Sequence, residues 1–455
     1  MGRLTAFASG LSGRYFKPED IITAVARQGA GMLAVRVSSL VILFGVQALL
    51  ARLLGADQFG VYTVALAVMG VLQLFARQGF EIAASRFVGG YSGVDNWSLL
   101  NGFVKASRML VLGGAVIFSI GLVVVANLIS DSLGDGMLHS LWLIAAILPL
   151  FTVLQLEAAI VRGMGRASIA DIPTWILHPL ILAAGVSAAV FLADAPASAP
   201  TALAVFLGTA VCAVIVQHII MMRVLPESVH AAAPEYRWAE WMKAAPAMML
   251  FAGSAVLISQ ANTVLLGAMS SAAEAGIYNI SGRIAGILQL VTFCFIAAIG
   301  PVAARLHAKG DLDELARVTS IGVRVVFAVA LLASVILLAA GEYILAIFGD
   351  EFRQGYHTLL VLLLGQLFWA ATVPAGVLLN MTGHHNESGR ILLVAAAVNF
   401  GLCALLIPVY GSIGAAIATS VAIVLWNGIM AWSAERRVGI RAYLTFTRAT
   451  ATRSP

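Results

Sequence analysis

Apolar stretches of about 18 or more residues recur along this whole chain of 455 residues, and each is long enough to cross a hydrocarbon core of roughly 30 Å. Within a bilayer, every backbone N–H and C=O group needs a partner inside the protein, so such stretches fold as helices. Charged residues make up 11% of the chain, against about 25% in a typical soluble domain. The sequence therefore predicts an all-α polytopic membrane protein.

The hydropathy pattern predicts twelve transmembrane helices. They lie near residues 31–53, 59–80, 107–128, 138–160, 169–192, 201–222, 246–268, 276–299, 320–341, 357–380, 389–408 and 413–433. Most of the basic residues fall in the N-terminal segment, in alternate connections and in the tail, whereas the opposite connections are mainly acidic. By the positive-inside rule, both termini are expected in the cytoplasm. The pI of 9.3 is then explained by topology, and no nucleic-acid partner is expected.

The second and eighth predicted helices carry an internal repeat. GVYTVALAVMGVLQL, which begins at Gly60, aligns with GIYNISGRIAGILQL, which begins at Gly276, and the two segments share a Gly-x-Tyr and a Gln. VRGMGRASIADI after the fourth helix and LNMTGHHNESGRI after the tenth form a second pair. Because six is an even number of crossings, both copies enter the membrane from the same face, which is the parallel repeat of many transporters.

The repeat divides the chain into two six-helix lobes around a central cavity. We expect a cytoplasmic N-terminal segment at 1–30, which becomes helical from Pro18, an N-lobe at 31–224 and a cytoplasmic linker at 225–245. A C-lobe at 246–433 and a basic cytoplasmic tail at 434–455 follow. No catalytic residue, metal or cofactor is predicted. The phosphate loop G-x-x-x-x-G-K-[ST] is absent from the sequence, so transport driven by ATP hydrolysis is not expected.

Arg36 and Arg283 are the basic residues that fall inside predicted helices away from their ends. An arginine at the centre of a membrane costs about 2.5–3.5 kcal/mol on insertion scales. Glu81 is expected to pair with Arg77, four residues earlier on the same helix face, and no mid-membrane carboxylate is predicted for either arginine. Since a guanidinium binds phosphate in a bidentate manner, both arginines are predicted to bind an anionic headgroup.

Five further polar residues inside the predicted helices could line the same cavity, and hydrogen bonding between helices is an equally good interpretation of each. They are Gln73, Arg77, Gln260, Asn262 and Gln289.

Three segments carry a resemblance to a known family. They are LGADQFGVYTVAL after the first predicted helix, EAAIVRGMGR after the fourth and YGSIGAAIATSVAIVLWN in the twelfth. The chain resembles the polysaccharide (O-antigen type) flippases of the multidrug/oligosaccharidyl-lipid/polysaccharide exporter superfamily. The resemblance implies movement of an undecaprenyl-diphosphate-linked oligosaccharide from the cytoplasmic to the periplasmic leaflet of a bacterial inner membrane, by alternating access, for lipopolysaccharide or another surface polysaccharide.

The resemblance also implies the partners, which are membrane lipid and the enzymes that set polymerisation and chain length. The first alternative is a cation-coupled multidrug antiporter of the same superfamily. Such antiporters typically need a buried carboxylate, often in the first helix, where this chain has Arg36. A membrane polymerase or ligase is the second alternative, but it would be expected to show a large external loop, and every predicted external loop is short.

Overall fold

A computed structural model describes residues 18–293, 295–296, 299, 306, 312–381, 385–438 and 443–444. Within these residues the regular structure is entirely helical, and no strand occurs. The predicted all-α fold, with two lobes of membrane-spanning helices, is confirmed.

The N-lobe contains α2 (Pro18–Arg77), so the predicted helical structure from Pro18 onward is present. Its other elements are α3 (Phe80–Ser92), α4 (Trp97–Leu128), η1 (Ser130–Ser132), α5 (Asp135–Gly163), α6 (Ala167–Ala170), η2 (Pro173–Leu177), α7 (His178–Phe191) and α8 (Ala199–Val224). The short helix α9 (Glu227–Ala231) follows in the linker.

The C-lobe contains α10 (Trp238–Met269), α11 (Ala272–Ala285), α13 (Leu312–Ala346), η3 (Asp350–Gly355), α14 (Tyr356–Thr372), α15 (Pro374–Met381) and α16 (His385–Val438). Among the described residues, eight helices are long and apolar enough to cross a membrane. Two of these, α2 and α16, are kinked at Gly55 and Gly411, where the backbone is not helical. Each of these two helices therefore holds two of the predicted crossings.

Proline residues account for two further irregularities. The predicted tenth helix is divided at Val373 into α14 and α15, and α15 begins with Pro374. A π-helical turn, η2, precedes Pro179 in the fifth predicted helix. Proline removes a backbone donor and disturbs the helical ladder, which explains both breaks.

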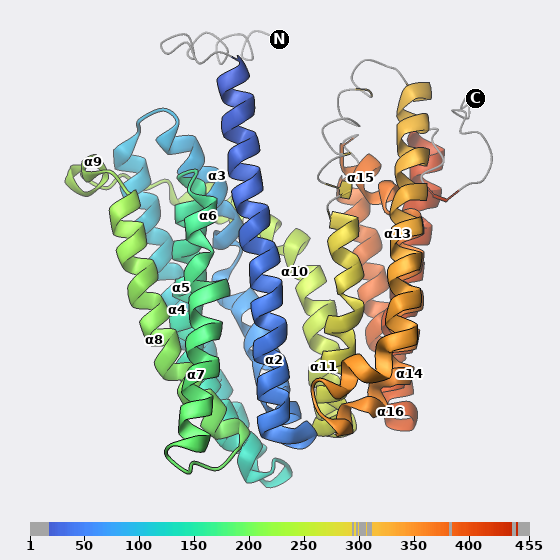
Figure 1. Cartoon of the computed structure of the whole chain (residues 1–455). Helices are drawn as coiled ribbons and strands as arrows, with labels where there is room; N and C mark the ends of the chain where they lie inside the picture. Colours follow the sequence, from blue (N-terminus) through green and yellow to red (C-terminus); the bar gives the residue numbers. More distant parts are fainter. Residues whose placement is uncertain are drawn as a thin grey trace.

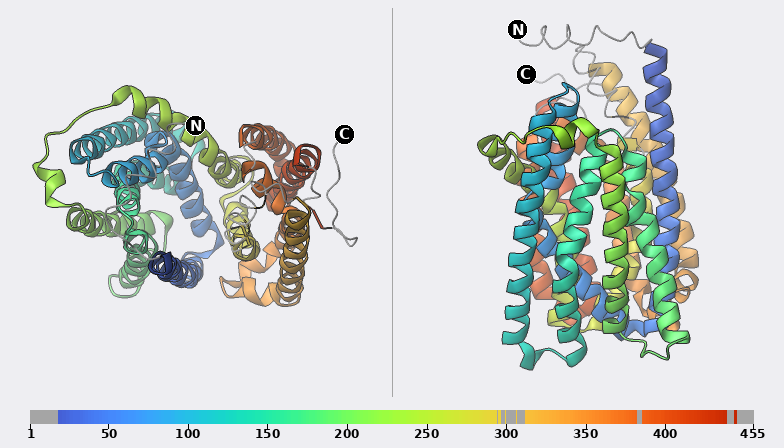
Figure 2. Two further views of the ribbon diagram at one scale, coloured as in Figure 1. Left: turned by 90° about the horizontal axis from the view of Figure 1, so that it is seen from above. Right: turned by 90° about the vertical axis from the view of Figure 1, so that its left-hand side faces the viewer.

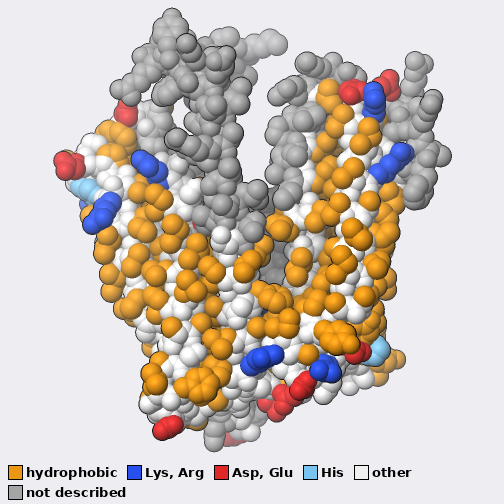
Figure 3. All heavy atoms as spheres, in the orientation of Figure 1, with side chains coloured by type: hydrophobic (Ala, Val, Ile, Leu, Met, Phe, Trp, Pro, Cys, Tyr) orange, Lys and Arg blue, Asp and Glu red, His pale blue; other side chains and the backbone are white. Residues whose placement is uncertain are grey.

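The two lobes are joined at one end of the molecule and apart at the other. Helix α2 begins and α16 ends at the same end, here called the terminal end, and the kinks of α2 and α16 lie at the opposite, distal end (Figure 1). The space-filling view shows a deep hollow between the lobes that is open toward the terminal end (Figure 3). The view from above shows each lobe as a separate bundle of helices (Figure 2, left).

The hydrophobic cores follow the same division. One core, here called the shared core, contains buried residues of both lobes, for example Leu50 and Phe59 with Ile277 and Phe348. Two smaller cores lie toward the terminal end. The first contains N-lobe residues and the start of α10, and the second contains C-lobe residues only. Apolar burial therefore holds the lobes together at the distal end and holds each lobe separately at the terminal end.

The linker between the lobes is attached to the N-lobe. The backbone N–H of Glu235 donates to the carbonyl of Ser98 at 3.0 Å, and the side-chain amide of Asn101 donates to the carbonyl of Ala232 at 2.8 Å. The indole of Trp241, which is fully buried in the N-lobe core, donates to the hydroxyl of Tyr91 at 2.9 Å. The first turns of α10 therefore move with the N-lobe.

Candidate functional site

Arg283 lies in the last turn of α11, a helix whose start is fixed by its own sequence. Ser271 caps the helix, because its hydroxyl accepts from the backbone N–H of Glu274 at 3.2 Å. The arginine at the other end is favourable, since cations are stabilised near helix C-termini. Its Nε donates to Oδ1 of Asn279, one turn earlier, at 3.0 Å. Asn279 therefore orients the guanidinium and leaves the two terminal amino groups available.

Arg283 has an exposed side chain. Its helix, α11, packs against the second half of α2, so the neighbouring lobe is close. We therefore expect the guanidinium to lie in the cleft between the lobes. Among the described residues, no carboxylate forms an ion pair with Arg283.

The contact between α11 and the second half of α2 fixes how far Arg283 lies from the junction of the lobes. A Cβ atom at Gly276 would lie 3.2 Å from the Cα of Gly60, so these backbones touch at the distal end. Arg283 follows Gly276 by seven residues, or about 10 Å at a rise of 1.5 Å per residue. The Cα atom of Arg283 is therefore roughly 10 Å from Gly276 along the helix axis, toward the terminal end, and its guanidinium reaches back by about one turn to Asn279.

Arg36, the second predicted headgroup ligand, belongs to α2. Its side chain lies outside the part of the structure that is described, so its role stays a prediction.

Two of the five predicted lining residues, Gln260 and Gln289, are half-buried. Gln260 of α10 packs against Gly70 of α2, where a Cβ atom would lie 3.1 Å from its Cγ, and its side chain is half-buried. Gln289 is also half-buried and lies in the helical turn after Gly286. Lining the cavity stays a prediction for both residues.

Asn262 is fully buried in a cluster of polar groups inside the C-lobe. Its amide nitrogen donates to the hydroxyls of Tyr278 at 3.1 Å and Thr419 at 2.7 Å. Its amide oxygen accepts from Asn399 at 2.7 Å and from the thiol of Cys403 at 3.4 Å. The cluster joins α10, α11 and both halves of α16, and its contacts are those of hydrogen bonding between helices.

Gln73 and Arg77 belong to a second polar network, inside the N-lobe. Arg77 donates to Glu81 and to Gln155 of α5. The predicted pair of Arg77 and Glu81 is confirmed, but the two residues do not share one helix face, because α2 ends at Arg77 and Glu81 lies in α3. Glu81 also pairs with Arg162 at 3.3 Å, and Arg162 pairs with Asp171 at 2.7 Å. Gln73 is buried and bonds weakly to Gln155 at 3.4 Å. Arginines and carboxylates therefore balance here, which does not favour an anion.

A third cluster was not predicted. Glu157 of α5 is 2% exposed and pairs with Arg108 of α4. His218 of α8 lies 3.1 Å from the same carboxylate and 2.8 Å from the guanidinium of Arg108. Hydropathy places Glu157 near the end of its helix, and only the packing of three helices shows that it is buried and paired.

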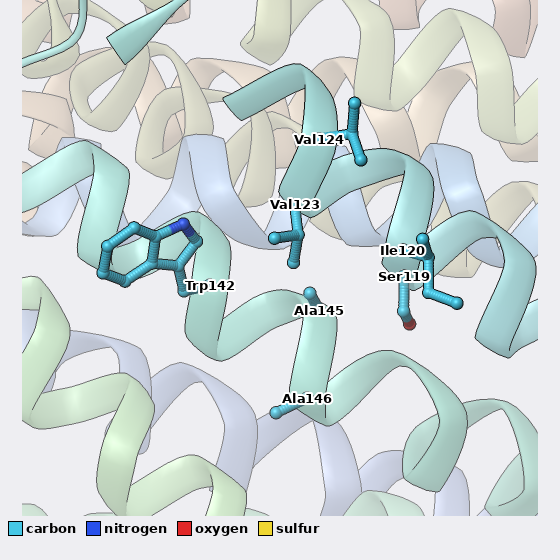
Figure 4. A pocket seen from close by; sticks show the side chains of 7 residues that line it. All are labelled: Ser119, Ile120, Val123, Val124, Trp142, Ala145 and Ala146. Carbon is cyan, nitrogen blue, oxygen red and sulfur yellow. The ribbon is translucent and has the colours of Figure 1, made fainter. Parts of the chain in front are cut away.

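A shallow apolar hollow between α4 and α5 is separate from the cleft (Figure 4). Its walls are Ser119, Ile120, Val123, Val124, Trp142, Ala145 and Ala146. Ile120, Val124 and Trp142 are exposed, so the hollow belongs to the outer surface of the N-lobe.

Two lobes of membrane helices, joined at one end and separated by a cleft at the other, define a multi-pass membrane transporter. The family model described as "Polysaccharide biosynthesis protein" matches residues 26–307, which is more than half of the chain. The chain belongs to this family, within the multidrug/oligosaccharidyl-lipid/polysaccharide exporter superfamily. A second model, MatE, matches residues 246–405. No curated protein sequence matches the chain.

Solved structures of the same superfamily share the fold. An inward-facing multidrug resistance MATE family transporter has a TM-score of 0.73 and 12% identity, covering 89% of this chain and 98% of its own. The lipid II flippase MurJ, in an inward closed conformation, matches with a TM-score of 0.66 and 11% identity. The match covers 89% of this chain and 87% of the MurJ chain. A mutant of the Vibrio cholerae MATE transporter VcmN matches with a TM-score of 0.58 and 14% identity. The match covers 91% of this chain and 97% of the VcmN chain.

Proposed function

We propose that this protein moves an undecaprenyl-diphosphate-linked oligosaccharide from the cytoplasmic to the periplasmic leaflet of a bacterial inner membrane. The terminal end is then the cytoplasmic end, and the described conformation is open to the cytoplasm. The flipped saccharide supplies the synthesis of a surface polysaccharide such as O-antigen, with a polymerase and chain-length machinery as downstream partners. Membership of the polysaccharide biosynthesis family supports this proposal.

One observation carries the proposal: Arg283 is exposed in a membrane-spanning lobe and forms no ion pair with a described carboxylate. Such a guanidinium needs a counter-charge when the cleft closes around it, because an isolated charge away from bulk water is costly. A diphosphate supplies that charge and matches the paired donors of the guanidinium. Arg36 is the second proposed ligand. The saccharide would occupy the cleft while the lipid tail stays in the bilayer.

The membrane potential favours this direction of transport. Moving one charge across 100 mV is worth about 2.3 kcal/mol, and an inside-negative potential drives an anionic headgroup outward. The lobes would then separate at the distal end and close at the terminal end, so that the cleft faces the periplasm.

The decisive experiment is to delete the gene and measure lipid-linked saccharides in each leaflet. We expect accumulation in the cytoplasmic leaflet, rescue by the wild-type gene, and little rescue by Arg283→Ala. Arg353→Ala is the matched control, since Arg353 is exposed at the distal end and pairs with Asp350 of its own lobe. Full rescue by Arg283→Ala would contradict the role of this arginine, and normal flipping in the deletion strain would contradict the function.

The match of the MatE model to residues 246–405 supports one alternative, a cation-coupled multidrug antiporter. Glu81, Glu157 and Asp171 are the carboxylates inside the described N-lobe helices that could serve such a function, and each is paired with arginine. Unchanged lipid intermediates together with increased dye sensitivity in the deletion strain would favour the antiporter.

A further inference from the structure

Two charged residues cross between the lobes at the distal end. Arg52 lies in the first half of α2, three residues before the kink at Gly55, and belongs to the N-lobe. Glu351 lies in η3 of the C-lobe, which follows the end of α13. Both side chains are exposed, so the two residues stand at the edge of the shared core and not within it.

Arg52 binds the carbonyl groups at the end of a C-lobe helix. Its Nε donates to the carbonyl of Ile347 at 2.6 Å, and its Nη2 donates to the carbonyl of Ala346 at 3.3 Å. Ala346 is the last residue of α13. The last carbonyls of a helix lack partners within the helix, and a cation at this end also interacts favourably with the helix dipole.

Glu351 makes the complementary contact with a helix of the N-lobe. Its Oε2 accepts from the backbone N–H of Ala56 at 2.7 Å. Ala56 begins the second half of α2, directly after Gly55, whose φ of 72° breaks the helix. The first N–H groups after this break need an acceptor, and a carboxylate at a helix N-terminus is favoured by the dipole.

A contact of the same kind occurs at the kink of the C-lobe helix α16, but there both partners belong to the C-lobe. Glu274 of α11 accepts from the backbone N–H of Ser412 at 2.7 Å, directly after the kink at Gly411 of α16. This bond joins two elements of one lobe and survives any movement of the lobes as rigid bodies. The contacts of Arg52 and Glu351 join different lobes, so they break when the distal end opens.

We propose that Arg52 and Glu351 form a latch that holds the distal end closed, in which each lobe caps a helix end of the other. Opening of the cleft at the distal end requires the release of both contacts and leaves α13 and the second half of α2 without these caps. The latch rests on the alternating movement of the proposed function but not on the identity of the substrate.

The test is a distance measurement between spin labels in the full-length protein in lipid nanodiscs, without substrate. One label replaces Ser132 of the N-lobe and the other replaces Tyr343 near the end of α13, both of them exposed. A charge at a helix terminus typically changes the equilibrium constant between two conformations by a factor of roughly two to five. We therefore expect Arg52→Gln and Glu351→Gln each to raise the fraction of long distances by about two- to fivefold.

Arg353→Gln is the control, because Arg353 pairs with Asp350 within η3, at the same end but inside one lobe. Arg52→Lys, which keeps the charge, tests the role of the cation, and a label pair at Ser92 and Ser132 checks that the N-lobe remains folded. An unchanged distance distribution in both latch variants, or an equal change in Arg353→Gln, would overturn the proposal. Since no substrate is present, failure of the latch and failure of the proposed function are distinguishable.

Discussion

Gly60 of α2 and Gly276 of α11 touch across the junction of the lobes. A Cβ atom on Gly276 would lie 3.2 Å from both the Cα and the nitrogen of Gly60, and one on Gly60 would lie 1.8 Å from the carbonyl oxygen of Ala272. The sequence repeat aligns these same two glycines with each other. The lobes therefore meet as the two halves of a symmetric dimer do, with equivalent residues facing each other near the axis.

Gly60→Ala should destabilise this junction. The added methyl group has backbone atoms of α11 as neighbours, so it cannot be accommodated by rotation of a side chain. Overpacking of this kind costs typically 1–3 kcal/mol, and we expect a lower thermal unfolding temperature in detergent. Gly282→Ala is the control, because no atom lies within 4 Å of its Cβ position. Equal unfolding temperatures for the two variants would contradict the close contact.

Arg283→Ala should weaken binding of undecaprenyl diphosphate by tenfold or more, since hydrogen bonds to charged groups contribute about 1.5–3 kcal/mol. Asn279→Ala should have a smaller effect, because Asn279 orients the guanidinium through its 3.0 Å hydrogen bond and leaves the charge in place. The measurement is binding to purified protein in nanodiscs, with neutral undecaprenol as the control ligand. If both variants bind the diphosphate like the wild type, Arg283 is not its ligand.

Asn262→Leu should destabilise the C-lobe. The substitution leaves Tyr278, Thr419 and Asn399 without the hydrogen bonds that Asn262 supplies in a fully buried cluster. Tyr278 and Thr419 still bond to each other at 2.8 Å, but the amide nitrogen of Asn399 loses its bond to Asn262. A buried polar group left unpaired costs about 1–3 kcal/mol. Thermal unfolding of Asn127→Leu provides the comparison, because the exposed Asn127 bonds only to the carbonyl of Val123 in its own helix. A normal unfolding temperature for Asn262→Leu would show that the cluster contributes little.

Tyr91 should make the fold less stable at high pH. Burial raises the pKa of its hydroxyl, and the hydrogen bond from Trp241 partly opposes this shift. The folded protein therefore holds this proton to higher pH than the unfolded chain, whose tyrosines titrate near pH 10. Stability is thus expected to fall as the pH rises above about 10. Tyr91→Phe should reduce that fall, as measured by thermal unfolding between pH 8 and 11, and an unchanged slope would exclude Tyr91 as its source.

Local sequence predicts the parts of this fold that depend on a single helix or on the repeat. Hydropathy locates the crossings, and a spacing of four residues predicts the pair of Arg77 and Glu81, although a turn between α2 and α3 separates the two residues. The alignment of Gly60 with Gly276 identifies two equivalent positions, although it does not show that they touch.

The remaining contacts depend on partners that lie far away in the chain. The sequence predicts equally well that Asn262 lines a cavity or that it bonds between helices. Its hydrogen bonds to Asn399 and Thr419 of α16 decide for the second interpretation. Glu157 is paired because α4 and α8 bring Arg108 and His218 to it. Arg52 binds backbone carbonyl groups. Since every residue has a backbone carbonyl, the sequence does not indicate which one an arginine will bind.

Helix α10 has its first turns held by the N-lobe core, through Trp241 and Ala245, and Leu266 near its other end held by the shared core. Helix α10, which connects the two lobes, is thus held at both ends. Any movement of one lobe relative to the other must bend α10 between these two contacts, so the bending stiffness of α10 helps to set how far and how easily the cleft closes on one side of the membrane and opens on the other.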